Sequence, residues 1–218
     1  MELNSVFYAN LTILLFLRKV YSLQTLNKIS HKLFDGGMWL AISFLIEPTT
    51  ILFTVLLYIS IFLNKQQNYQ TLLIPFLGFV APVFLYYTYC FWTDTTDNFF
   101  RLWDVSTIID IQILKEASYI FTLGFVGVFT VLSILLKTPK TLAVLNQFRK
   151  NWILILSHFT IALLVAFLVP NKTGAELIFV GFPAAIILAN ALELFQKKWF
   201  ADIFILVFVI ASIVNFFI

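Results

Sequence analysis

The 218-residue chain is 61% hydrophobic and only 11% charged, with a mean hydropathy of +0.96. Soluble domains are about half apolar and about one quarter charged, so this much apolar surface cannot be hidden inside a soluble core. The net charge of +3 is too small to suggest nucleic-acid binding, and the single cysteine, Cys90, excludes an intrachain disulfide. The composition therefore predicts an integral membrane protein, folded as one transmembrane domain over residues 1–218.

Apolar runs follow one another along the whole chain. A helix that crosses the hydrocarbon core of a bilayer needs about 20 residues, within a range of roughly 17–25. Four of the runs reach that length, the first three are shorter, and the last is marginal. We expect an all-α, polytopic transmembrane bundle with about seven or eight membrane segments. The runs are Val6–Leu17, Gly36–Ile46, Thr49–Leu63, Thr71–Trp92, Tyr119–Leu136, Trp152–Val169, Leu177–Leu194 and Ile203–Ile218.

The region from Gly36 to Leu63 is too long for one crossing and is interrupted in its middle. As one helix it would be about 42 Å long at about 1.5 Å per residue, against a hydrocarbon core of about 30 Å. Glu47-Pro48 interrupts it, and proline both removes a backbone donor and disfavours a helical conformation at the preceding residue. The region is therefore either one kinked crossing or a short helical hairpin.

The distribution of basic residues decides between the two, because cytoplasmic loops are enriched in lysine and arginine. With the hairpin, and with residues 18–35 cytoplasmic, 11 of the 14 basic residues lie inside; with one crossing they divide seven and seven. We therefore predict the hairpin, eight crossings, and both termini on the outer side of the cell inner membrane. The inner residues are Arg18, Lys19, Lys28, Lys32, Lys65, Lys137, Lys140, Arg149, Lys150, Lys197 and Lys198.

Most acidic residues fall on the predicted outer face, whose longest segment is 93–118. Within that segment Val105, Ile108 and Ile109 stand at helical spacing, which predicts a short helix over 104–118 lying along the membrane surface. The acidic residues predicted to lie outside are Glu2, Glu47, Asp94, Asp97, Asp104, Asp110, Glu116 and Glu176.

Five residues of the outer face form a candidate ligand-binding site. Glu47 lies at the tip of the hairpin, and Asp94 and Asp97 could form an acid/base pair or bind a hard cation. Lys172 and Glu176 are four residues apart in one connection, where Lys172 could hold a lipid phosphate. Each also has a plain structural explanation. Glu47 could be an ordinary turn residue, Asp94 and Asp97 could be solvated loop carboxylates, and Lys172 and Glu176 could form an ordinary Lys–Glu pair.

Two polar residues lie inside apolar runs, His158 and Asn190. An ionisable residue in a membrane helix is a functional hypothesis by default, and its alternative is a neutral histidine hydrogen-bonded to a neighbouring helix. Asn190 is expected to hydrogen-bond between helices. Two histidines and one cysteine offer no zinc or iron spacing, so we expect no metal and no cofactor, and no catalytic residue can be assigned.

Several stretches resemble an uncharacterised family of polytopic inner-membrane proteins from Bacteroidota. They are Tyr8–Leu23, Lys32–Trp39, Pro170–Glu176 and Phe182–Asn190. The resemblance covers nearly the whole chain and implies no particular activity. Members of that family are longer at the N-terminus, which would make this chain a shortened one.

A more distant similarity links the chain to GT-C glycosyltransferases, which use polyprenyl-linked sugars. The run from Gly36 to Leu52 looks like their short helical hairpin, and Pro170–Ala189 looks like their late outer loop and the helix after it. The resemblance implies that Lys172 faces a polyprenyl phosphate. The chain departs from the pattern because it lacks the first outer loop, where those enzymes carry their main catalytic aspartate.

Three functions follow from these observations. The first is a non-catalytic subunit of a cell-envelope complex, whose partners are membrane lipid and other envelope proteins. The second is a GT-C-like relative that binds polyprenyl-phosphate-linked sugar at the outer face. The third is a transporter of small molecules or lipids, for which the interrupted region at Glu47-Pro48 would serve as a discontinuous helix.

Overall fold

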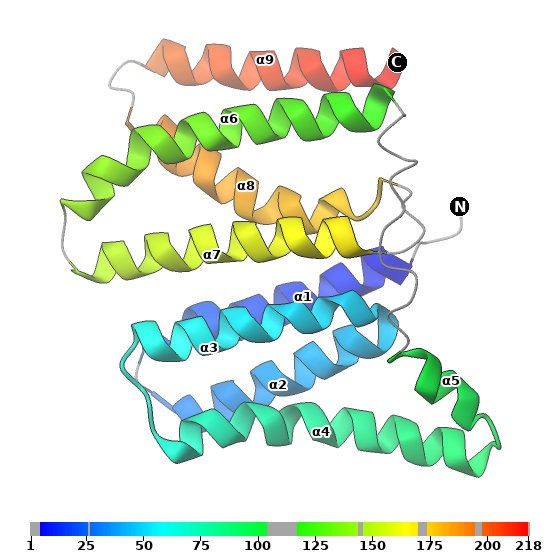
Figure 1. Cartoon of the computed structure of the whole chain (residues 1–218). Helices are drawn as coiled ribbons and strands as arrows, with labels where there is room; N and C mark the ends of the chain where they lie inside the picture. Colours follow the sequence, from blue (N-terminus) through cyan, green and yellow to red (C-terminus); the bar gives the residue numbers. More distant parts are fainter. Residues whose placement is uncertain are drawn as a thin grey trace.

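The computed structural model describes residues 5–25, 27–103, 117–143, 146–169, 174–194 and 198–217, and within these ranges the regular structure is helical. Figure 1 shows the longer helices lying side by side with their axes along one common direction. The elements are α1 Ser5–Ser22, α2 Ile29–Ile46, the 3-10 helix η1 Pro48–Leu52, α3 Phe53–Leu63, α4 Tyr69–Trp92, α5 Thr96–Arg101, α6 Ala117–Leu142, α7 Asn146–Leu168, α8 Leu177–Leu192 and α9 Lys198–Phe217. The all-α prediction is confirmed for this part of the chain.

The predicted break at Glu47-Pro48 is confirmed. Helix α2 ends at Ile46, Glu47 is extended with φ −139° and ψ 101°, and Pro48 opens η1. The Thr50 hydroxyl donates to the Glu47 carbonyl oxygen at 2.8 Å and closes the turn. Figure 1 shows α2 and α3 running back along each other from this turn, which is the hairpin.

The first two helices are longer than their apolar runs, because both extend into the basic segment. Helices α1 and α2 have 18 residues each, or about 27 Å at about 1.5 Å per residue. Lys19 on α1 and Asp35 on α2 form an ion pair with Nζ and Oδ2 2.7 Å apart, so two charges are accommodated within helices. The expected cytoplasmic segment 18–35 is therefore mostly helix, with a short connection between Ser22 and Ile29.

Three helical segments in the described part of the chain are long and apolar enough to cross a membrane by themselves, fewer than the seven or eight expected. They are Tyr69–Trp92, Tyr119–Thr141 and Phe148–Leu168. Three shorter apolar helical segments accompany them: Pro48–Leu63, Leu177–Leu192 and Asp202–Asn215. The predicted surface helix over 104–118 falls almost entirely on residues outside the described ranges.

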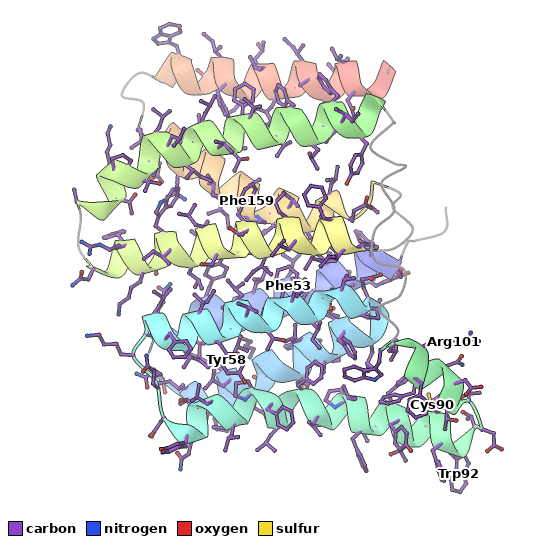
Figure 2. The ribbon with its side chains drawn as sticks, viewed as in Figure 1. Phe53, Tyr58, Cys90, Trp92, Arg101 and Phe159 are labelled. Carbon is purple, nitrogen blue, oxygen red and sulfur yellow. The ribbon has the colours of Figure 1, made fainter. Side chains whose placement is uncertain are left out.

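The centre of the bundle is a phenylalanine-rich core between α1, α3, α7 and α8. Phe16, Phe53 and Phe179 are almost fully buried. The rings of Phe16 and Phe53 have centroids 6.4 Å apart, and those of Phe53 and Phe179 lie 6.2 Å apart. Figure 2 labels Phe53 and Phe159 within this interior. This core packs α7 and α8 against α1 and α3.

Helices α2 and α4 approach until their backbones touch. A Cβ atom at Gly37 of α2 would overlap the carbonyl oxygen of Pro75, and one at Gly78 of α4 would overlap the carbonyl oxygen of Phe34. The two contacts are reciprocal, since each helix supplies one glycine and one carbonyl three residues away. Such close approach through small residues is typical of helix pairs in membranes.

Helix α9 lies at the edge of the bundle beside α6 (Figure 1). The two helices meet through aromatic rings, with the centroids of Phe125 and Phe208 4.9 Å apart and those of Phe129 and Phe204 5.3 Å apart. The Thr122 hydroxyl also donates to the Asn215 side-chain oxygen at 3.1 Å. Part of the high phenylalanine content is thus used to dock the last helix.

Candidate functional site

The helices connect alternately at two ends of the bundle, and the two ends differ in charge. One end, here called the basic end, contains the connections α1–α2, α3–α4, α6–α7 and α8–α9. The opposite end, called the acidic end, contains the α2–η1, α4–α5 and α7–α8 connections. The basic residues of the described ranges that lie at the basic end are Arg18, Lys19, Lys28, Lys32, Lys65, Lys137, Lys140, Arg149, Lys150 and Lys198.

Glu47 and Glu176, two members of the predicted outer site, are both buried at the acidic end. Glu47 is 7% exposed and accepts a hydrogen bond from the Thr49 hydroxyl at 3.2 Å. Burial raises the pKa of the Glu47 carboxyl above its ordinary value, and hydrogen bonds from Thr49 oppose the rise. Glu176 is completely buried just before α8 and is hydrogen-bonded to the side chain of Tyr119 on α6. A buried carboxylate is costly unless it is paired, so both positions are unusual for a simple connection.

Asp94 and Asp97 lie at the same end, but on its surface. Asp94 follows α4 in a left-handed conformation with φ 53°, and Asp97 stands in the first turn of α5. Figure 2 shows Trp92 at the tip of α4 and Arg101 at the other end of α5. Lys172 lies outside the described residues. The meeting of all five predicted residues at one site therefore stays a prediction.

His158 is enclosed by four elements. It lies on α7, is 1% exposed, and its Nδ1 is 2.9 Å from the hydroxyl oxygen of Tyr21 on α1. Its ring also contacts Phe53 of α3 and Phe182 of α8, with centroids 5.9 Å and 5.8 Å away. The tautomer of the imidazole decides whether the Tyr21 hydroxyl or an Nδ1–H is the donor of this bond. The geometry matches the structural alternative, a histidine hydrogen-bonded to a neighbouring helix.

Asn190 lines a pocket that the sequence did not predict. The pocket, called the basic-end pocket below, opens between α6, α7 and α8 and has a volume of about 560 Å³. Asn190 donates its amide N–H to the Ile186 carbonyl at 2.8 Å, a bond within α8 rather than the predicted bond between helices. The lining residues are Lys137, Lys140, Thr141, Phe148, Asn151, Trp152, Ile155, Asn190, Glu193 and Leu194.

From the sequence, Lys137 and Lys140 were used only to predict which loops are cytoplasmic. A more specific signal is present in their spacing. Lys137 and Lys140 are three residues apart on α6, and Asn190 of α8 is three residues before Glu193, the helical residue that caps α8, so each pair shares one face. The spacing does not reveal that these two faces line the same pocket, together with Asn151 of α7.

No group of three or more histidine, cysteine, aspartate or glutamate side chains that could hold a metal ion occurs among the described residues. A family model described as a family of unknown function, DUF6427, matches residues 1–218. The comparisons with curated proteins and with solved structures found no match.

Proposed function

The chain belongs to the DUF6427 family, and from its structure we propose that it is an eight-pass protein of the cell inner membrane that serves as a non-catalytic subunit of an envelope complex. The passes are α1, α2, η1 with α3, α4, α6, α7, α8 and α9. The basic end faces the cytoplasm and the acidic end faces outward. Both termini then lie on the outer side.

The observation that carries the membrane orientation in this proposal is the separation of charge between the two ends of the bundle. Helices α1 and α2 are not among the segments apolar enough to cross a membrane alone, but their charged residues are near the basic end, where long side chains reach the headgroups. Lysine and arginine gather on the cytoplasmic side of membrane proteins, so the basic end is assigned inward. The shorter passes require a locally thinner bilayer or little tilt.

The proposed partner surface lies at the acidic end, where α5 folds back on α4. The Phe99 ring packs on Tyr87 with centroids 5.1 Å apart and so holds the short helix in place. Trp92 and Phe100 nevertheless remain 87% and 61% exposed. Aromatic residues are enriched at protein interfaces, and Asp94 and Asp97 add negative charge beside them. This combination suits an apolar partner segment that carries basic residues.

Photo-crosslinking tests the subunit role. A benzoylphenylalanine in place of Trp92 is expected to form a protein adduct of one discrete mass in living cells. The matched control is the same group in place of Leu135 on α6, which is 65% exposed and lies along the helix rather than at the acidic end. The partner protein found in the adduct should also co-purify with the wild-type chain. It should not co-purify with a Trp92→Glu variant. Identical adduct patterns at the two positions would contradict the role.

A second candidate function is a GT-C-like relative that binds polyprenyl-phosphate-linked sugar at the acidic end. The burial of both Glu47 and Glu176 there supports it. If it is right, the purified protein should bind polyprenyl phosphate, and the double variant Glu47→Gln, Glu176→Gln should bind it differently from the wild type. Equal binding by the two proteins would remove this candidate.

A further inference from the structure

We infer that the basic-end pocket binds the headgroup of a phospholipid that carries both a phosphate and a hydrogen-bond donor, such as ethanolamine or glycerol. The inference goes beyond the proposed function. It requires only that the helices lie in a bilayer, and it does not depend on a protein partner or on which end faces outward.

Two lysines supply the groups for the phosphate. Lys137 and Lys140 both line the pocket from the same face of α6. Lys137 is 17% exposed, and its Nζ is 3.2 Å from Oε2 of Glu193 on α8. An ammonium group has three N–H donors, so the ion pair leaves donors on Lys137 for a second anion. Lys140 is exposed at the mouth of the pocket and adds a second cation.

Acceptors for a donor on the same headgroup lie opposite these lysines. The side-chain oxygen of Asn151 is buried and has no hydrogen-bond partner. Asn190 uses its amide nitrogen for the Ile186 carbonyl, which leaves its side-chain oxygen as an acceptor. Glu193 adds a carboxylate. Buried polar atoms are normally hydrogen-bonded, so the Asn151 oxygen calls for a donor that the protein does not supply.

The surroundings of the pocket favour a lipid over a free phosphoester. Trp152 lines the pocket and donates its indole N–H to the Thr138 hydroxyl oxygen at 3.1 Å, and Phe148 at the same end is 60% exposed. Aromatic residues in these positions mark the level of the headgroups. On an adjacent face of α8, Ala189 and Leu192 line a groove of about 370 Å³ toward α9, whose lining is almost wholly apolar. An acyl chain can lie in that groove while its headgroup occupies the pocket.

Native mass spectrometry of the delipidated protein tests the inference. Equimolar phosphatidylethanolamine, phosphatidylglycerol and phosphatidylcholine are added in separate experiments. The first two should be retained about tenfold more strongly than phosphatidylcholine, whose quaternary ammonium cannot donate to Asn151. Glycerophosphoethanolamine, which has the same headgroup and no chains, should compete poorly.

Three variants assign the contacts. Lys140→Gln should weaken both favoured lipids about tenfold, since it removes one cation from the phosphate. Asn151→Leu should reduce the preference over phosphatidylcholine, because Asn190 and Glu193 remain as acceptors, while leaving phosphatidylcholine binding unchanged. Lys65→Gln is the matched control, because it removes a lysine from the same end of the bundle but outside the pocket, and it should change nothing.

Three results would overturn the inference. If phosphatidylcholine binds as strongly as the other two lipids, the acceptors of the pocket do not bind a headgroup donor. Equal losses in Lys140→Gln and Lys65→Gln would mean that the general charge of this end, and not the pocket, attracts the lipid. Full competition by glycerophosphoethanolamine would make the ligand a soluble phosphoester. Each variant is first checked for unaltered thermal unfolding, so that a folding defect is recognised.

Discussion

Gly37→Ala and Gly78→Ala are each expected to destabilise the protein by about 1–3 kcal/mol or more, the range for overpacking a tight contact. An added methyl group at either glycine meets a backbone carbonyl oxygen of the opposite helix, which a side-chain rotation cannot relieve. Helices α2 and α4 would have to separate, and α4 would lose its main support. Thermal unfolding of the purified protein in detergent measures the effect.

Gly124→Ala on α6 is the matched control, because a Cβ atom there would meet nothing within 4 Å. In this position alanine is expected to be neutral or to stabilise the helix by up to about 1 kcal/mol, the difference in helix propensity between the two residues. If all three variants unfold at the wild-type temperature, the close packing of α2 on α4 described here is wrong.

His158→Ala is expected to cost about 3–5 kcal/mol, as truncation of a large buried ring does. The imidazole fills the space between α1, α3, α7 and α8, so its loss leaves a cavity at the centre of the bundle. Tyr21→Phe removes only the hydroxyl that is hydrogen-bonded to His158 Nδ1, and should cost about 1–3 kcal/mol. Unfolding in detergent again provides the measurement.

His31→Ala provides the comparison for His158, because His31 is exposed near the start of α2. That variant should unfold like the wild type. If the His158→Ala protein is as stable as the His31→Ala protein, the structural role of His158 is wrong, and a functional role becomes the better explanation.

The hairpin could be predicted from sequence because its cause is local. Pro48 lies in the middle of a run that is too long for one crossing, and the charge count then predicts the number of passes between the basic segments. Pro75, Pro82 and Pro183 lie inside helices, so a proline alone would not have predicted the break. The extents of α1 and α2 could not be read in the same way. Their charged ends are stabilised by the ion pair between Lys19 and Asp35, which requires the two helices to be adjacent.

The candidate sites depend still more on tertiary structure. The hydrogen bond between Tyr21 and His158 joins residues 137 positions apart, and no periodicity of the sequence predicts it. The basic-end pocket combines faces of three helices, each of which looks ordinary alone. The sequence placed Glu47 at the tip of the hairpin, but its burial is likewise a property of the folded bundle that the sequence did not predict.

Cysteine labelling tests the central claim, the orientation of the bundle in the membrane. Asn98→Cys places a thiol at the acidic end, while Gln67→Cys and Ala143→Cys place thiols at the basic end, all at exposed positions in a Cys90→Ala background. In spheroplasts treated with an impermeant maleimide, position 98 should be labelled at once, and positions 67 and 143 only after the membrane is permeabilised. Labelling of 67 and 143 in intact spheroplasts, without labelling of 98, would contradict the proposed orientation.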